Sequence, residues 1–311
     1  MKGIVIKSTG SWYDVRLEDG ERVAARIKGK FRLKGIKTTN PIAVGDVVSL
    51  KKEEDGRAVI HAIDPRKNYI IRKSINLSKR SHIIASNIDQ AILVVTLNQP
   101  KTYTAFIDRF LVTAEAYHIP TVIVFNKIDV YSDTEKEELT VLKKAYEQIG
   151  YTCLEISVLK EINIDAVKNV MKDKTSMVSG HSGVGKSTLL NLIDSSLDLA
   201  TNEISEMHQQ GKHTTTFAEM YELPFGGYII DTPGIKAFGL IDFEKTELSH
   251  YFLEMRERLN HCHFNNCQHI NEPKCAIKDA VKNGFIAEFR YNNYVSMIKD
   301  DEDENYRGLG Y

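Results

Sequence analysis

A glycine-rich segment in the second half of the chain has the residue types and spacing that bind phosphate groups. Residues 180–187 read Gly-His-Ser-Gly-Val-Gly-Lys-Ser, which matches the pattern G-x-x-x-x-G-K-[ST] in full. Glycines let the backbone N–H groups of such a loop turn toward phosphate oxygens at the start of a helix. Lys186 can reach the β- and γ-phosphates, and the Ser187 hydroxyl can bind Mg²⁺. The predicted phosphate contacts are Gly180, His181, Ser182, Gly183, Val184, Gly185, Lys186, Ser187 and Thr188.

A second motif points to a guanine base. Residues 126–129 read Asn-Lys-Ile-Asp and follow a predicted strand. A carboxylate can accept hydrogen bonds from the N1–H and exocyclic amine of guanine, which adenine does not present. The pattern is weak alone, but beside a P-loop in the same sheet it favours a guanine nucleotide. The predicted base contacts are Asn126, Lys127, Asp129 and, as a looser match after the next strand, Ser157.

Two further segments resemble nucleotide-dependent switches. Residues 231–234 (Asp-Thr-Pro-Gly) match D-x-x-G, which places Asp231 near Mg²⁺ and the Gly234 N–H near the γ-phosphate. Residues 214–216 are three threonines, any of which can close on Mg²⁺, and we favour Thr215. The predicted Mg²⁺ ligands are Ser187, Thr215 and Asp231.

The residue after the D-x-x-G motif argues for slow unaided hydrolysis. Ras-like proteins have a water-orienting Gln there, whereas this chain has Ile235, whose side chain cannot position water. His213 is the nearest replacement, because an imidazole can orient an attacking water. A polar role in the switch loop is the alternative for His213, and we expect a partner to complete the site. The predicted catalytic residues are Lys186, His213 and Thr215.

The order of the motifs along the chain is unusual. Ordinary G domains present the phosphate loop first, then the switch threonine, D-x-x-G and N-K-x-D. Here residues 126–129 come before the P-loop. The same sheet can form from a circularly permuted chain, because the ends of a domain lie at the surface and often near each other.

Near the C-terminus, three cysteines and a histidine have the spacing of metal ligands. They form the pattern C-x4-C-x-H-x5-C within a single short segment. Three thiolates and one imidazole make a closed tetrahedral Zn²⁺ site, which is structural because no coordination position stays open. The predicted ligands are Cys262, Cys267, His269 and Cys275. His261 and His263 compete for the fourth position, and free thiols are the alternative.

Strands and helices that could position these residues can be read from the periodicity. The expected strands of the first 65 residues are 4–7, 12–17, 22–27, 47–51 and 58–63, which suit a small OB or SH3-like barrel. The later expected strands are 91–96, 121–125, 153–157, 176–179 and 228–230. The expected helices are 106–117, 135–149, 165–171, one starting at Lys186, 245–260, 274–283 and 286–299. Alternation of strands and helices predicts a mostly parallel sheet covered by helices.

Charge is unevenly distributed along the chain. The whole protein has 311 residues and a net charge of −1, but residues 1–80 hold 19 Lys and Arg against 9 Asp and Glu. Residues 22–37 include seven basic residues and no acid, with an aromatic side chain among them. This combination on a barrel fits RNA binding, and a solvated loop is the alternative. The predicted RNA contacts are Arg26, Lys28, Lys30, Phe31, Arg32 and Lys34.

The composition excludes several protein classes. With 42% hydrophobic and 27% charged residues the chain is neither disordered nor collagen-like. Its first residues lack a signal-peptide pattern, and its longest apolar stretch, residues 91–97, falls short of the ~20 residues of a membrane span. We expect a cytoplasmic monomer.

Together these features resemble one family, the circularly permuted ribosome-associated GTPases called RsgA or YjeQ. The resemblance covers nearly the whole chain and includes the barrel, the permuted motif order, the G-K-H-T-T-T and D-T-P-G stretches, and the cysteine pattern. It implies rRNA-mediated binding to the small ribosomal subunit, GTP hydrolysis stimulated by that subunit, and a late role in its maturation. It also implies zinc at the four predicted ligands and a catalytic role for His213. His263 and Lys274 depart from the residues frequent in the family at those places.

The expected organisation is multidomain. It comprises an OB-fold RNA-binding domain at 1–66, a basic linker at 67–84, a permuted α/β P-loop GTPase domain at 85–241, and a mostly helical zinc-binding domain with an acidic tail at 242–311. The expected cofactors are GTP or GDP, Mg²⁺ and one structural Zn²⁺. A second hypothesis, an RNA-binding chaperone with a structural nucleotide site, is opposed by the intact Lys186, Ser187 and Asp231. A P-loop kinase or ATPase is opposed by Asn126 and Asp129.

Overall fold

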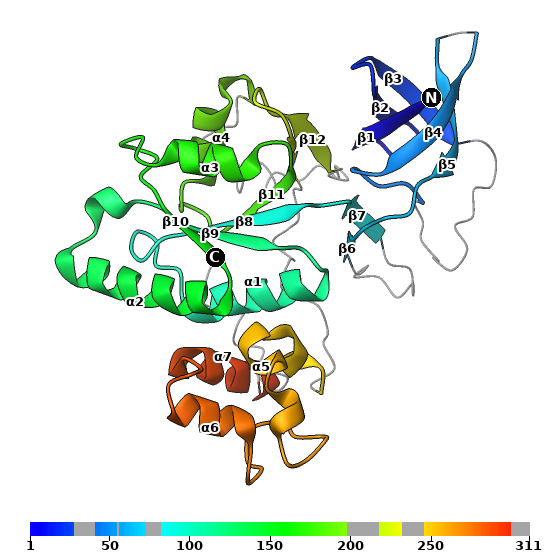
Figure 1. Ribbon diagram of the computed structural model, residues 1–311. Helices are drawn as coiled ribbons and strands as arrows, with labels where there is room; N and C mark the ends of the chain where they lie inside the picture. The colour runs from blue at the N-terminus through cyan, green and yellow to red at the C-terminus, as the bar shows by residue number, and fades with distance from the viewer. Residues whose placement is uncertain (28–40, 55, 73–81, 198–217, 232–245, 300–311) are drawn as a thin grey trace, which may run out of the picture.

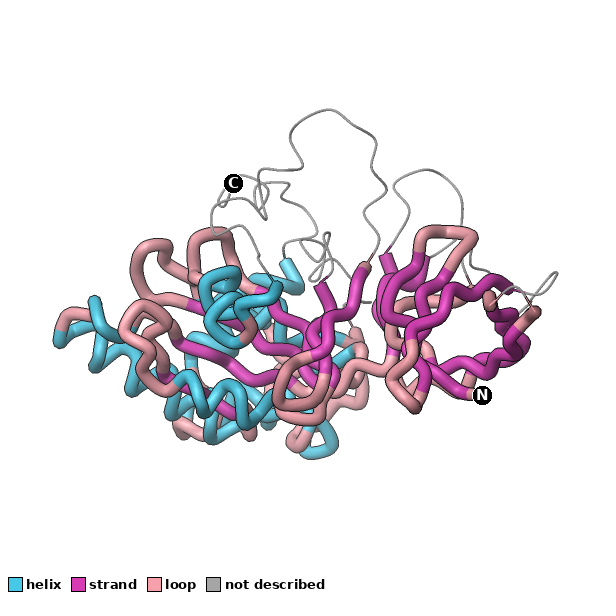
Figure 2. The backbone as a smooth tube through the Cα atoms, turned by 90° about the horizontal axis from the view of Figure 1, so that it is seen from above, coloured by secondary structure: helices cyan, strands magenta, loops and turns pink. Residues whose placement is uncertain are grey.

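The computed structural model describes residues 1–27, 41–54, 56–72, 82–197, 218–231 and 246–299. Three parts follow one another: an N-terminal barrel of strands, a central sheet with helices on both faces, and a C-terminal group of short helices (Figure 1). Figure 2 shows the barrel strands beside the strands of the central sheet. Within the described ranges, no helix has the length and apolar character needed to cross a membrane.

Five strands form the barrel, close to their predicted positions. They are β1 (Lys2–Ser8), β2 (Tyr13–Leu17), β3 (Arg22–Ile27), β4 (Val47–Lys52) and β5 (Ala58–Ile63). Their hydrogen-bonded order is β1-β2-β3-β5-β4, and pairing of β4 with β1 closes the barrel. Inward side chains such as Val5, Val15 and Ile60 are fully buried. Alternation with a period of two places these residues on one face, which explains why the strands were predictable.

The segment expected to be a basic linker contains two strands that its sequence did not indicate. β6 (Tyr69–Arg72) and β7 (His82–Ser86) pair antiparallel. Next to them, Arg66 Nη2 lies 2.6 Å from Asp46 Oδ2, and the Ser86 hydroxyl donates to Asp46 Oδ1 at 2.6 Å. The Asp46 side chain is fully buried. This charge-assisted network fixes the barrel to β7 in one orientation.

Six strands form the central part of the sheet. In spatial order they are β10 (Thr152–Glu155), β9 (Thr121–Phe125), β8 (Gln90–Val95), β11 (Thr175–Ser179), β13 (Tyr228–Asp231) and β12 (Glu219–Glu222). All are parallel except β12, which the sequence did not predict. Helices α1 (Thr104–Ala116) and α2 (Asp133–Ile149) cover one face, and α3 (Ile164–Met171) and α4 (Lys186–Ile193) cover the other (Figure 1). Every residue of β8 is buried between these two layers.

The chain builds this sheet outward from its middle. β8, β9 and β10 extend in one direction, and the chain then returns to place β11 on the other side of β8, followed by β13. The N-K-I-D strand β9 and the P-loop strand β11 therefore share one sheet, although β9 comes first in the sequence. This confirms the permuted arrangement. The reversal between β8 and β11 is a topological switch point, where open α/β sheets bind ligands at the carboxyl ends of their strands.

The C-terminal part is helical, but the helix predicted over 245–260 is wrong. The described residues instead form three short turns, η4 (Leu248–Tyr251), α5 (Leu253–Arg256) and η5 (Leu259–His261). Phe252 interrupts them with an extended backbone, and its fully buried ring packs edge-on against Tyr294 at 5.4 Å between centroids. Burial of this ring outweighs continuation of the helix. α6 (Ala276–Lys282) and α7 (Glu288–Lys299) lie near their predicted positions.

A buried cluster of charges joins the C-terminal helices to the central part. Arg290 of α7 is fully buried, with Nη1 2.6 Å from Asp108 Oδ1 of α1 and Nε 2.8 Å from Glu254 Oε1 of α5. Asn293 Nδ2 and the Tyr146 hydroxyl also donate to Asp108, at 2.6 and 2.8 Å. Burial raises the pKa of Asp108, and the Arg290 charge opposes that rise. Each carboxylate thus depends on the guanidinium for its charge compensation.

We expect Arg290→Met to lower the free energy of unfolding by about 3–5 kcal/mol, because two carboxylates would stay buried without a counter-charge. Arg256→Met is the matched control. Arg256 Nη1 lies 3.8 Å from Glu115 Oε2 of α1, but the Arg256 side chain is 55% exposed, so we expect a loss below about 1 kcal/mol. Urea denaturation followed by circular dichroism measures both variants. Equal losses would contradict a special role for Arg290.

Candidate nucleotide-binding site and metal centre

The polar motifs meet because the strands that precede them are parallel. β8, β9, β10, β11 and β13 end at the same edge of the sheet. Their loops bring residues 97–103, 126–129, 156–158 and 180–186 to this edge, beside the switch point between β8 and β11. Asp231 is the last residue of β13, so its backbone reaches the edge as well.

The P-loop has the backbone of a phosphate cradle. Gly180, Gly183 and Gly185 have φ values of 145°, 80° and 98°, a region that favours glycine. A Cβ on Gly180 would lie 2.2 Å from the carbonyl oxygen of Val94, and one on Gly185 would lie 2.4 Å from Asn126 Nδ2. No side chain fits at either position. α4 begins directly after Gly185 without a side-chain cap, so no capping group competes with a ligand for its first N–H groups.

Lys186 lies over the loop that precedes it. Its Nζ donates to the carbonyl oxygens of Gly180 at 2.8 Å and His181 at 2.6 Å. Ser187 and Thr188 follow in the first turn of α4. The His181 ring packs on Phe106 of α1, 3.8 Å between ring centroids, and burial and then the Lys186 charge lower its pKa. The loop therefore offers one cationic side chain, Lys186, to an anionic ligand, and the His181 ring beside it is uncharged.

One buried amide joins the P-loop to both predicted base-binding loops. Asn126 Nδ2 donates to the Val184 carbonyl at 2.8 Å, and the Val158 N–H donates to Asn126 Oδ1 at 3.1 Å. Lys127 Nζ donates to the carbonyl oxygens of Gly183, at 2.9 Å, and Gln99. The predicted phosphate and base contacts are thus brought together, as the two motifs require.

Ser157 orients the predicted base-binding carboxylate. Its buried hydroxyl donates to Asp129 Oδ1, and it accepts from the Lys160 N–H at 3.1 Å. A carboxylate held in this way can present acceptors to a base with two neighbouring donors, as guanine has. The loose sequence match at Ser157 is thereby given a physical role.

Sequence reasoning missed Tyr131 and Phe106. The Tyr131 hydroxyl donates to the Asn126 carbonyl at 2.6 Å and accepts from the Leu97 N–H at 2.9 Å. Burial raises the pKa of Tyr131 to about 12, so it remains a donor at neutral pH. Neither residue belongs to a motif, and only their contacts identify them.

Several predicted residues lie outside the described part of the chain. These are His213, Thr215, Gly234, Lys28, Lys30, Phe31, Arg32 and Lys34. Arg26 is described: it lies on β3, and its Nη2 is 3.0 Å from Glu53 Oε2.

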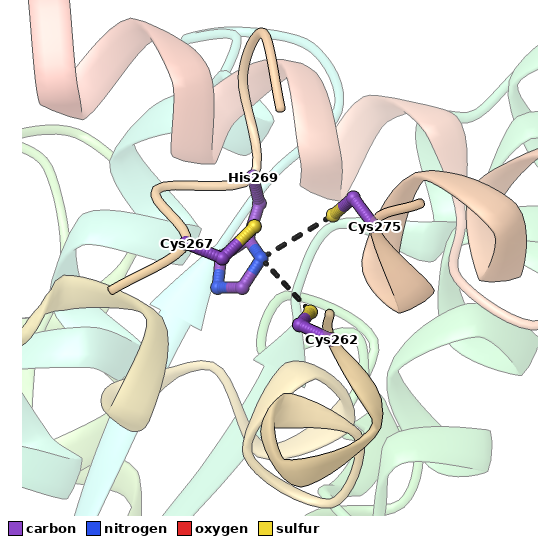
Figure 3. A group of neighbouring side chains, drawn as sticks. All are labelled: Cys262, Cys267, His269 and Cys275. Atoms are coloured by element: carbon purple, nitrogen blue, oxygen red, sulfur yellow. Dashed lines mark hydrogen bonds between the residues drawn. The ribbon is translucent and has the colours of Figure 1, made fainter. Parts of the chain in front are cut away.

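The predicted metal ligands converge on one point (Figure 3). One ligand atom from each of Cys262, Cys267, His269 and Cys275 lies within 4.8 Å of the others. His269 Nδ1 is 3.5 Å from Cys262 Sγ and 3.4 Å from Cys275 Sγ. Tetrahedral zinc with Zn–S of ~2.3 Å and Zn–N of ~2.1 Å requires an N···S edge of about 3.6 Å. The geometry therefore fits zinc, with His269 rather than His261 or His263 in the group.

Surrounding residues hold this cluster in shape. The Glu272 carboxylate accepts from three backbone N–H groups, those of Gln268, Ile270 and Asn271, at 2.9–3.1 Å, and these bonds lower its pKa. The Tyr291 and Tyr294 hydroxyls of α7 donate to the carbonyls of His269 and Gln268, at 2.7 and 2.9 Å. Burial lowers the pKa of His269, which favours the neutral imidazole that a metal needs. The arrangement of donors suits a structural site.

Ser157→Ala should weaken GDP binding about tenfold, because Asp129 loses a hydrogen bond to its charged carboxylate. Isothermal titration calorimetry with GDP measures the effect. Thr140→Ala is the control, since the Thr140 hydroxyl donates to the Lys136 carbonyl on the exposed face of α2, at 2.8 Å. An unchanged affinity in Ser157→Ala would remove the assigned role.

Comparisons with known proteins identify the family of the chain. A family model described as the RsgA GTPase matches residues 63–241, and one described as the RsgA N-terminal domain matches residues 2–60. Relatives from Christiangramia forsetii and Bacteroides fragilis are both named small ribosomal subunit biogenesis GTPase RsgA. The first is 57% identical over 310 residues, with 99% of this chain and 98% of the relative covered. The second is 53% identical over 307 residues, with 99% of each covered.

Two solved structures share the fold over nearly the whole chain. The crystal structure of YjeQ from Thermotoga maritima has a TM-score of 0.80 and 39% identity, covering 96% of this chain and 97% of that one. The structure of YloQ, described as a circularly permuted GTPase, has a TM-score of 0.76 and 31% identity, covering 100% and 96%. The chain belongs to the RsgA GTPase family.

Proposed function

We propose that this GTPase binds the small ribosomal subunit through rRNA, hydrolyses GTP to GDP and phosphate under stimulation by the subunit, and acts late in its maturation. Relatives 53–57% identical over 99% of the chain are named for small-subunit biogenesis, which supports the same role here. GTP hydrolysis itself follows from membership of a GTPase family. The observation that carries the activity is the Asn126 amide, which joins the P-loop to the base-binding loops.

We propose the nucleotide contacts that the sequence motifs predict. The phosphates lie in the loop 180–188, where Lys186 compensates their charge, and the base lies against Lys127 and Asp129. The residues that would hold Mg²⁺ are Ser187, Thr215 and Asp231, and the ion would neutralise phosphate charge. His213 orients the attacking water. Catalysis comes from positioning and electrostatics, because phosphoryl transfer to water needs no covalent intermediate with the protein.

We propose one structural Zn²⁺ at Cys262, Cys267, His269 and Cys275. The distances and the absence of an open position in the four-ligand set support this role. The metal would tie together short helices that bury little apolar surface alone.

We propose that the barrel contacts rRNA. The assigned residues are Arg26, Lys28, Lys30, Phe31, Arg32 and Lys34. Support comes from the basic composition of residues 22–37 and from Arg26, whose side chain is 54% exposed on β3. An RNA-binding chaperone with a structural nucleotide site remains the second candidate, favoured by the basic segment but not by the complete P-loop.

We propose that the protein is a cytoplasmic monomer. We propose that its domain boundaries lie at residues 66, 84 and 241. The barrel, which closes on itself, supports the first division, and the apolar cluster of the C-terminal helices, which also includes Val112 of α1, supports the last. The connector at 67–84 includes β6 and the start of β7.

Purified small subunits should raise GTP turnover more than about tenfold, since Ile235 cannot orient water as the Gln of Ras-like proteins does and a partner is expected to complete the site. Lys186→Ala should lower turnover about 100-fold or more, both with and without subunits. Lys144→Ala, on the exposed side of α2, should keep both turnover rates.

Raising salt from ~50 to ~200 mM should weaken the stimulation steeply if phosphate contacts carry the binding. Equal turnover with and without subunits would contradict the proposal, and equal competition by ATP would contradict the guanine assignment.

The purified protein should contain one zinc per chain, and Cys267→Ala should lose it together with the ordered C-terminal part. Elemental analysis and limited proteolysis measure the two effects. Cys153→Ala is the matched control, because Cys153 is a buried thiol on β10 outside the cluster. Full zinc content in Cys267→Ala would refute the assignment.

A further inference from the structure

β12 lies between the barrel and the strand that carries the predicted switch aspartate. One edge of β12 pairs with β13 in four positions, from Glu219↔Asp231 to Glu222↔Tyr228. Its other edge pairs with β1 of the barrel at Lys7↔Glu219. The barrel strands and the GTPase strands therefore form one continuous sheet of eleven strands.

A single row of residues crosses this junction. Lys7, Glu219 and Asp231 are direct partners on three neighbouring strands. Strands in a sheet lie ~4.8 Å apart, so a barrel residue lies about 10 Å from the Asp231 backbone. Lys7 Nζ is 3.1 Å from Glu219 Oε1. This row therefore links the barrel to the Asp231 backbone through two neighbouring strand pairings.

The junction combines strand pairing with ion pairs. Lys7 and Glu219 are the one pair of register partners between β1 and β12 in the described residues. A second ion pair, Arg16 Nη2 to Glu222 Oε1 at 2.6 Å, holds the other end of β12. A cavity of about 370 Å³, lined by Lys7 and Glu219 among others, adjoins the row. Apolar packing adds to these pairs, because Ile6 of β1 is buried in the same core as Ala218 and Met220.

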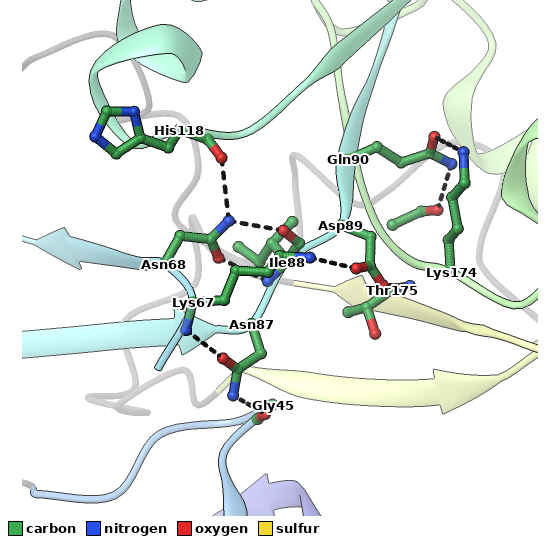
Figure 4. Close-up of polar contacts among 11 residues, drawn as sticks. Gly45, Lys67, Asn68, Asn87, Ile88, Asp89, Gln90, His118, Lys174 and Thr175 are labelled. Carbon is green, nitrogen blue, oxygen red and sulfur yellow. Dashed lines mark hydrogen bonds and ion pairs between the residues drawn. The ribbon is translucent and has the colours of Figure 1, made fainter. Parts of the chain in front are cut away.

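A second connection lies next to this one, because Gly45 and Asp46 bond the backbone of Val5 on β1. The buried Asp46–Arg66–Ser86 network anchors the barrel to β7. Asn87 Nδ2 also donates to the Gly45 carbonyl at 2.9 Å, and Asn68 bonds the backbone of Ile88 at the start of the central sheet (Figure 4). Of these two connections, the β1–β12 junction is the one whose paired residues lead directly to Asp231.

We propose that Lys7 and Glu219 are positioning residues that transmit barrel contact with the small subunit to Asp231, and so couple subunit binding to GTP hydrolysis. This inference rests on the proposed function, in which the barrel binds rRNA and Asp231 holds Mg²⁺. The ion pair is 40% and 35% exposed at its two side chains, and exposed pairs contribute little to folding. Its loss therefore changes coupling and spares the fold.

The test compares Lys7→Gln and Glu219→Gln with the charge-swapped double variant Lys7→Glu/Glu219→Lys. Lys2→Gln is the matched control, because Lys2 lies on the same strand, β1. Its exposed ion pair with Asp64, at 2.7 Å, joins two residues of the barrel and does not reach β12. GTP turnover is measured over a series of small-subunit concentrations, which separates maximal rate from the half-saturating subunit concentration.

Both single variants should keep unstimulated turnover and half-saturation within about twofold, and lose about fivefold or more of the maximal stimulated rate. The swapped variant should regain most of that loss, and Lys2→Gln should match the unaltered protein. Full stimulation in both single variants, or a loss only in half-saturation, would overturn the inference. If the unaltered protein is not stimulated at all, the proposed function fails, and the coupling falls with it.

Discussion

The nucleotide site depends on one buried amide. Three loops from three different strands must keep their backbone N–H groups available at the sheet edge, so they cannot be fixed by burying that backbone in a core. Asn126 solves this by accepting from Val158 with its oxygen and donating to Val184 with its nitrogen. Tyr131 holds the main chain of Asn126 from the other side. The loops are therefore fixed at their bases, and their tips remain open to a ligand.

Charged contacts orient the barrel and the C-terminal helices relative to the central sheet. Apolar packing alone would let the C-terminal helices slide on α1, because the hydrophobic effect is non-directional. Arg290 requires Asp108 and Glu254 in one geometry, since a displaced partner would leave a buried charge uncompensated. In the barrel, the Asp46 carboxylate pairs with Arg66 and accepts a hydrogen bond from the Ser86 hydroxyl of β7. Both modules thus keep a defined orientation toward the nucleotide site.

The parts of the fold that were predictable from sequence are those with local signals. Barrel strands alternate, the P-loop has its glycines, and the four metal ligands lie within one short segment. β12 was missed because its four residues show a single buried side chain, Met220. Arg290 was missed because arginine is normally exposed, and its partner Asp108 is 182 residues away. Tyr131 and the bend at Phe252 likewise depend on contacts between distant segments.

Permutation leaves the site intact, because the site depends on which strands are neighbours in the sheet and not on their order in the chain. The change in connecting loops costs little, since loop-closure entropy varies slowly with loop length. What changes is the position of the chain ends. The barrel enters just before β8, the central strand, and the C-terminal part follows β13, whose last residue is Asp231. The C-terminal helices then return to α1 through Arg290, and α1 carries Phe106 against His181 of the P-loop. The barrel consequently reaches β13 through β12, and the C-terminal helices reach the P-loop through α1. An unpermuted chain would use these same strand ends for internal connections.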